Sequence, residues 1–193
     1  MLGLKLATDP RWVNLAEMSL DEILTDHAYC EQKAAISCIS LIQGFPDKVD
    51  MVSSLSPIVT EEWGHFRMVF NEIQKRNLTL GTQRKDEYVN ALLNFQLKGG
   101  SKEDRLLDKL LICALIEARS CERFRLLSLE LQDEDLKLFY HKFMIAEAGH
   151  YRLFIDLAKK YSDAEKVRIR WEEFLTYEAE IMENLALRGD RVH

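Results

Sequence analysis

Two segments of this 193-residue chain repeat the same spacing of side chains that can bind metal ions. Residues 62–70 read EWGHFRMVF and residues 147–155 read EAGHYRLFI, so Glu, Gly, His and Arg coincide without a gap. Because residues three apart are neighbours on a helix, the Glu and His of each segment can reach one ion. A single such pair arises easily by chance, whereas a repeat that shares the Gly and the Arg does not. The four candidate ligands are Glu62, His65, Glu147 and His150.

A two-metal site of this kind needs one further carboxylate from each of two other helices. Glu31 lies among small apolar residues, where a carboxylate is unfavourable unless it is paired or binds a metal ion. Glu117 has similar neighbours, and it precedes Glu147 by 30 residues, as Glu31 precedes Glu62 by 31. Glu122 is the alternative, but it precedes Glu147 by only 25 residues and falls on a different helix face. We therefore predict Glu117 as the sixth ligand and keep Glu122 in reserve.

The predicted set of four carboxylates and two imidazoles is typical of carboxylate-bridged pairs of iron or manganese ions. Hard oxygen donors with one nitrogen per metal suit these ions better than zinc or copper. Structural zinc sites more often use cysteine, and the four cysteines of this chain form no Cys-x-x-Cys pair. Arg67 and Arg152, at matching positions of the repeat, could act near the metals or could simply face solvent.

Few glycines and prolines and many strong helix formers predict an all-α chain. Capping patterns at Ser19, Ser101 and Ser162 mark helix starts, and Pro57 either kinks the second long helix or begins a new one. We expect a single domain over residues 1–193. Its parts are a four-helix core at about 19–161, a crossover segment at 86–97 and an added C-terminal helix at about 163–188. The core helices are expected at residues 19–43, 46–76, 101–129 and about 135–161, and Gly189 is expected to stop the last helix.

The formal charge is −6, from 26 basic and 32 acidic residues, which argues against a protein that coats nucleic acid through a broadly basic surface. A local basic patch could still come from residues 102–109, 119–123 or 166–170, although such runs are usually solvated helix faces. Charges interrupt every apolar run before it reaches the length of a membrane span. Asp9 and Pro10 end the apolar N-terminus too early for a signal peptide, so we expect a cytoplasmic protein.

Longer strings around the candidate ligands resemble the bacterial tRNA 2-methylthio-N6-isopentenyladenosine hydroxylases. The strings are HAYCEQKAA at 27–35, EEWGHF at 61–66, IEARSCERF at 116–124 and EAGHY at 147–151. The resemblance extends over nearly the whole chain. It implies a ferritin-like fold and a non-haem di-iron monooxygenase. Such an enzyme uses O2 to hydroxylate the isopentenyl group of the modified adenosine next to the anticodon.

The same resemblance implies a role for each of the six ligands. Glu62 and Glu147 would bridge two irons, Glu31 and Glu117 would be terminal ligands, and His65 and His150 would each bind one iron. The sequence contains no flavin, haem or iron–sulfur motif, so the electrons would come from a separate donor protein or reductase. The expected partners are this donor and the anticodon loop of tRNA, with no membrane, and the chain is expected to be a monomer or a small oligomer.

Three other functions remain open from the sequence. The same six ligands could serve a ferritin-like ferroxidase or iron-handling protein, which assembly into a cage would support. A di-iron hydroxylase of the demethoxyubiquinone type should carry a membrane-facing apolar helix, and no clear one is present. A metal-free helical interaction protein would leave the repeated motif unexplained.

Overall fold

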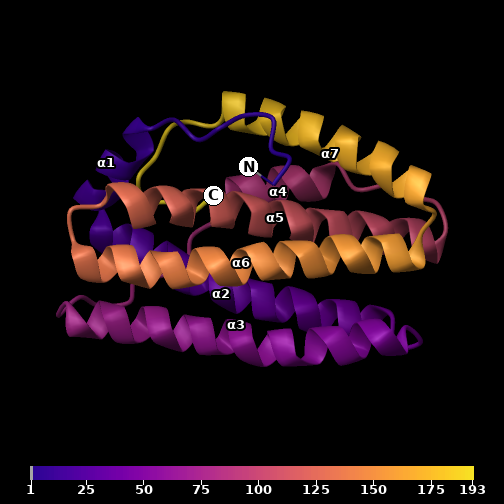
Figure 1. The fold of residues 1–193 in the computed structure, drawn as a ribbon, viewed down its shortest axis with the longest axis horizontal. Helices are drawn as coiled ribbons and strands as arrows, with labels where there is room; N and C mark the ends of the chain where they lie inside the picture. Colours follow the sequence, from indigo (N-terminus) through magenta and orange to yellow (C-terminus); the bar gives the residue numbers. More distant parts are fainter. Residues whose placement is uncertain (1) are drawn as a thin grey trace. The chain divides into compact units, whose positions relative to one another are not determined.

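A computed structural model describes residues 2–193, which form seven helices and no strand (Figure 1). The predicted all-α class is therefore confirmed. No helix in this part of the chain combines the length and the apolar character needed to cross a membrane. In chain order the helices are α1 (Arg11–Met18), α2 (Leu20–Gly44), α3 (Val49–Lys75), α4 (Glu87–Asn94), α5 (Lys102–Glu130), α6 (Glu134–Tyr161) and α7 (Ala164–Asn184).

The chain forms two compact units. The α2–α3 unit comprises Asn14–Lys85 and Arg188–Val192. The α5–α6 unit comprises Met1–Val13, Asp86–Leu187 and His193. Each unit is built around one pair of long helices that lie side by side and are joined by a short turn (Figure 1). Because the turns are short, the helices of each pair are antiparallel.

In the α2–α3 unit, α3 runs without interruption through Pro57, so of the two alternatives left open at that residue the start of a new helix does not occur. Arg188–Val192, near the end of the chain, also belong to this unit. A Cβ atom on Gly189 would lie 2.1 Å from the carbonyl carbon of Leu15. Only glycine, which has no Cβ atom, therefore lets the backbone at position 189 lie this close to the backbone of Leu15. Gly189 therefore serves a close approach of two chain segments and does not stop α7, which already ends at Asn184.

The helix starts agree only in part with the predicted caps. Ser101 and Asp104 form the predicted capping box at the start of α5. Ser19 occupies the position before α2, but its side chain makes no capping hydrogen bond. At α7 the cap is Asp163 rather than Ser162, and its carboxylate accepts hydrogen bonds from two backbone amides of the first turn. Asp and Ser are both good caps, so adjacent candidates cannot be separated by residue type.

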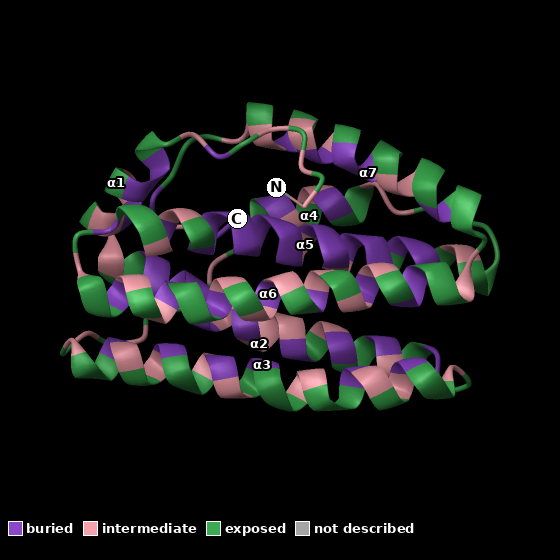
Figure 2. Ribbon diagram, viewed as in Figure 1, coloured by how far each residue is buried: buried purple, intermediate pink, exposed green. Residues whose placement is uncertain are grey.

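In the α5–α6 unit, α5 is the most deeply buried helix, and Figure 2 shows its middle almost entirely buried. Within this unit α6 packs along its length, while α4 and α7 pack against other parts of its surface. A helix buried on several sides can hold charged residues only if each has a partner. The acidic and basic residues of α5 are therefore informative about the site.

Candidate metal centre

The α2–α3 unit brings together three of the six predicted ligands. Glu31 on α2 and Glu62 and His65 on α3 are all buried. Nδ1 of His65 lies 3.2 Å from Oε2 of Glu62 and 3.3 Å from Oε2 of Glu31. One ligand atom from each of the three lies within 4.8 Å of the others. Two carboxylates and one imidazole thus converge between two neighbouring helices, as the spacing predicted.

His27 is a further member of this cluster that the sequence did not single out. It lies one helical turn before Glu31 and is fully buried. Its Nε2 atom is 2.7 Å from Oε1 of Glu31, so the ring can fix the orientation of that carboxylate. The available signal was the four-residue spacing of His27 and Glu31, which places both on one helix face.

His65 is strongly basic in this environment. Burial by itself lowers the pKa of its imidazole, but hydrogen bonds and charge from Glu31 and Glu62 outweigh it and raise the pKa to about 10. The ring is therefore protonated at neutral pH when only the two carboxylates are present. A bound metal ion could replace this proton, because each supplies positive charge that stabilises the two buried carboxylates.

The α5–α6 unit holds the other three predicted ligands. Glu117 on α5 and Glu147 and His150 on α6 are all buried. Ligand atoms of these three residues also lie within 4.8 Å of one another. Nδ1 of His150 is 3.4 Å from Oε2 of Glu147. The arrangement matches that of the α2–α3 unit in composition, with two carboxylates and one imidazole from two antiparallel helices.

Glu122, the reserve candidate, is engaged elsewhere in the α5–α6 unit. Its carboxylate accepts hydrogen bonds from the backbone amide of Thr8 at 2.8 Å and from the Thr8 hydroxyl at 2.7 Å. It also forms an ion pair with Arg119, which is fully buried. The structure thus brings Glu117 and not Glu122 to Glu147 and His150.

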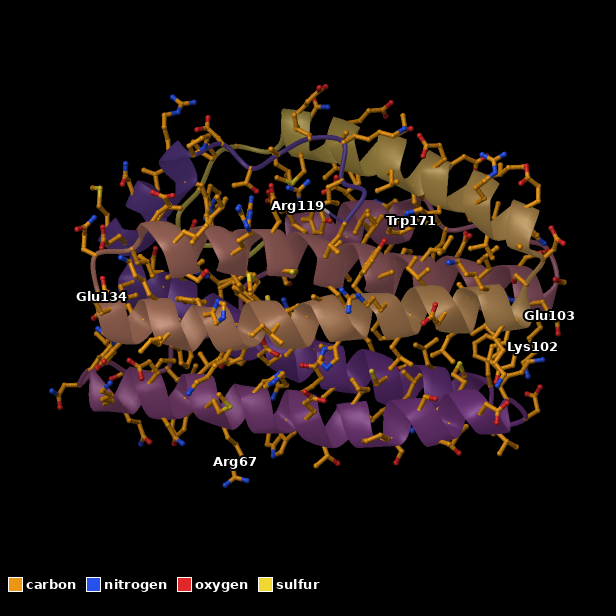
Figure 3. The ribbon with its side chains drawn as sticks, viewed as in Figure 1. Arg67, Lys102, Glu103, Arg119, Glu134 and Trp171 are labelled. Carbon is orange, nitrogen blue, oxygen red and sulfur yellow. The ribbon has the colours of Figure 1, made fainter. Side chains whose placement is uncertain are left out.

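The basic segments of the sequence are mostly neutralised within the chain. Arg119 and Arg123 are buried, so they cannot meet a phosphate at the surface. Lys166, Arg168 and Arg170 pair with carboxylates of Asp104, Glu165 and Asp108. Arg152 of the repeated motif is exposed. Its counterpart Arg67 also points into solvent, and Figure 3 shows this side chain extending away from α3.

The donor chemistry of both clusters fits iron or manganese. Each cluster offers carboxylate oxygens and one imidazole nitrogen, which is the mixture that these ions prefer. No cysteine belongs to either cluster within residues 2–193. Such buried acidic groups also require compensating positive charge, which a bound cation supplies.

Comparisons with known proteins agree over nearly the full chain. A family model described as tRNA-(MS[2]IO[6]A)-hydroxylase (MiaE) matches residues 2–193. A tRNA 2-(methylsulfanyl)-N(6)-isopentenyladenosine(37) hydroxylase of Pseudomonas putida is 35% identical over 156 residues, which cover 81% of this chain and 75% of that protein. The protein of the same name from Salmonella typhimurium is 30% identical, and the match covers 95% of this chain and 83% of that protein.

A solved structure also resembles the chain. It is "Protein 43 with aldehyde deformylating oxygenase activity" from Synechococcus, with a TM-score of 0.92 and 31% sequence identity. The match covers 98% of this chain and 94% of that protein. The predicted ferritin-like fold is confirmed by this similarity.

Proposed function

The chain belongs to the MiaE family of tRNA hydroxylases, and from this we propose that it hydroxylates the isopentenyl group of 2-methylthio-N6-isopentenyladenosine next to the anticodon of tRNA. The observation that carries the proposal is the pair of buried Glu–Glu–His clusters in a chain that matches this family from residue 2 to residue 193. Neither a family match without ligands nor ligands without a family match would define both chemistry and substrate.

The proposed cofactor is a pair of non-haem iron ions. The residues that would hold it are Glu31, Glu62, His65, Glu117, Glu147 and His150. The chemistry that such a pair supplies is the activation of O2 toward an unactivated C–H bond, with electrons from a separate donor. Four carboxylates carry four negative charges, which balance two divalent cations. This balance favours binding in a buried site, where uncompensated charge is costly.

The residues around the ligands have their own tasks in this proposal. His27 holds Oε1 of Glu31 and leaves the other oxygen of that carboxylate near His65. All six ligands are buried, from 1% exposed for Glu62 to 9% for His65. Burial keeps bulk water from the reacting atoms and strengthens the electrostatic interactions of the ligands.

The decisive experiment is nucleoside analysis of tRNA from cells that lack this protein, in a host that makes the modified adenosine. We expect the unhydroxylated nucleoside to accumulate and the hydroxylated one to return when the gene is restored. Restoration with His150→Ala should fail, and the purified variant should retain less than the roughly two irons per chain expected for wild type. His141→Ala is the matched control, because His141 is an exposed histidine of the same helix.

Unchanged nucleoside profiles in the deletion strain would contradict the proposed substrate. Full iron occupancy in His150→Ala would contradict the proposed ligands instead. Aldehyde deformylation is a second candidate activity because a structurally similar protein is named for it. Turnover of an aldehyde by the iron-loaded protein, together with unchanged tRNA nucleosides, would favour that activity.

A further inference from the structure

α3 carries a row of aromatic rings, of which Trp63 is exposed and Phe66 and Phe70 are half-buried. Trp63 stacks on Phe66 with ring centroids 4.8 Å apart and an angle of 14° between the planes. Phe66 and Phe70 are also parallel, with centroids 6.4 Å apart. Trp63 remains 47% exposed, although burial of so large an apolar ring is usually favourable. The Trp63 ring, held in place by Phe66, is therefore a preorganised stacking surface that faces solvent.

The same helix lines a surface pocket of about 410 Å³, a volume within the usual range for small-ligand sites. The lining residues are Glu61, Gly64, His65, Arg67, Met68 and Asn71. A Cβ atom added at Gly64 would meet no heavy atom within 4 Å, so the space above this glycine is open. His65 is the most exposed of the six proposed ligands. The pocket thus connects solvent with a residue of the proposed metal centre.

Arg67 adds a positive charge to this surface. It is exposed, and no residue of the described chain forms a hydrogen bond or ion pair with it. Figure 3 shows its side chain directed away from α3 into solvent. Glu61 is the acidic lining residue, and its carboxylate lies 4.0 Å from Nε2 of His65. An anionic partner would therefore be expected to contact Arg67.

We infer that the solvent-exposed side of α3 around Trp63, Gly64 and Arg67 binds the anticodon loop of the tRNA and admits the modified adenosine to the pocket above Gly64. The inference rests on the proposed function, which supplies the RNA substrate. Proteins recognise RNA loops by stacking unpaired bases on aromatic rings and on arginine planes. Trp63 provides the stacking surface, and Arg67 contacts a phosphate or a base. A contact limited to these few residues is compatible with a net charge of −6, because it does not need a broadly basic surface.

Gly64→Leu tests the pocket, and Gly149→Leu is the matched control from the repeated motif. A Cβ atom meets no heavy atom within 4 Å at either glycine, so both variants should fold. Replacing a helical glycine by leucine should even stabilise each helix slightly. We expect Gly64→Leu to weaken binding of an anticodon stem–loop that carries the modified adenosine and to raise its KM. Gly149→Leu should bind the stem–loop as wild type does, and both variants should keep the wild-type iron content.

Trp63→Ala and Arg67→Ala test the contacts outside the pocket by fluorescence anisotropy with the same labelled stem–loop. Loss of one base-stacking ring should weaken binding roughly five- to hundredfold. Loss of one phosphate contact should lower the slope of log affinity against log salt by about one. Lys159→Ala, an exposed cation on α6, is the control for unspecific charge effects.

Wild-type affinity in Gly64→Leu, Trp63→Ala and Arg67→Ala would overturn the inference. It would also be overturned if Trp63→Ala changed only the oligomeric state, because the aromatic row would then be a contact between copies of this chain. Failure of the proposed function has a different signature: the wild-type protein binds the stem–loop through these residues but does not hydroxylate it. Stem–loop binding therefore tests the inference about α3, and hydroxylation of the nucleoside tests the proposed function.

Discussion

Replacement of Arg119 by methionine should strongly destabilise the α5–α6 unit. Arg119 is fully buried, and its guanidinium donates hydrogen bonds to Oε1 of Glu178 at 2.6 and 2.9 Å. It also donates to the carbonyl oxygen of Leu6 at 2.9 Å and pairs with Glu122. Methionine fills much of the same space but removes the charge and every donor. The substitution therefore tests the ion-pair network and not the packing.

The expected loss can be estimated from the groups that remain. Glu178 is fully buried and would keep the hydrogen bond from Tyr88 at 3.2 Å, whereas Glu122 would keep its two bonds from Thr8. Breaking a buried pair by removing one partner typically costs about 3–5 kcal/mol of unfolding free energy. We expect a loss in this range for Arg119→Met. The exposed Arg125 of the same helix is the control, and Arg125→Met should change stability by less than about 0.5 kcal/mol.

The loss should also depend on pH. Burial raises the pKa of Glu178 above its usual value even though the charge of Arg119 lowers it, so removing Arg119 must raise that pKa further. A carboxyl with a raised pKa in the folded state destabilises the fold where it is ionised and stops doing so once it is protonated. The difference between Arg119→Met and wild type should therefore shrink as pH falls toward and below the usual carboxyl range.

Urea unfolding at several pH values measures both effects. A second substitution, Glu178→Gln in the Arg119→Met background, should recover part of the lost stability at neutral pH because no buried charge then remains at that position. The reasoning would be refuted by a loss no larger than that of Arg125→Met. A loss that grows toward acidic pH would refute the assignment of Glu178 as the stranded charge.

Two further predictions concern the C-terminal segment of the α2–α3 unit. Gly189→Ala should lower the unfolding free energy by about 1–3 kcal/mol, because the added Cβ would lie 2.1 Å from the carbonyl carbon of Leu15. Thermal unfolding measures this loss. An unchanged melting temperature would contradict the close approach of the two backbone segments. Asp190 has a pKa lowered to about 2, first by its hydrogen bond with Arg188 and further by Arg84. Its contribution to stability is therefore present above the usual pKa of 3.8 and is lost as pH falls toward about 2. Asp190→Asn should be less stable than wild type at neutral pH and equal to it near pH 2, and a constant difference across this range would contradict the assignment.

The long helices could be predicted from the sequence because their signals are local. Apolar periodicity and breakers placed α2, α3, α5 and α6 within a few residues of their observed bounds. The short helix α1 was not predicted, although Pro10 precedes it and Trp12 is a buried anchor within it. The end of α7 was predicted too late because Gly189 was interpreted as the residue that stops this helix. A glycine is needed at position 189 because the backbone there lies against Leu15, more than 170 positions earlier in the chain.

The candidate ligands could also be predicted from the sequence, because the spacings that link them are local. In an antiparallel pair joined by a short turn, equal chain separations place residues at equivalent depth. The separation of Glu31 from Glu62 therefore identified Glu117 as the counterpart that lies near Glu147. His27 could have been found in the same way, since its partner Glu31 is only one helical turn away.

Glu122 shows why sequence spacing alone cannot assign a role to every acidic residue of a buried helix. Glu117 and Glu122 are both buried on α5, and five residues separate them, which turns their side chains toward different neighbours. The partners of Glu122 include Thr8, 114 positions earlier in the chain, and no periodicity links two residues that far apart. A buried glutamate with an arginine three residues away is thus as consistent with a structural ion pair as with a ligand. Only the fold separates the two roles: it leaves Glu117 beside two other proposed metal ligands and surrounds Glu122 with hydrogen-bond donors.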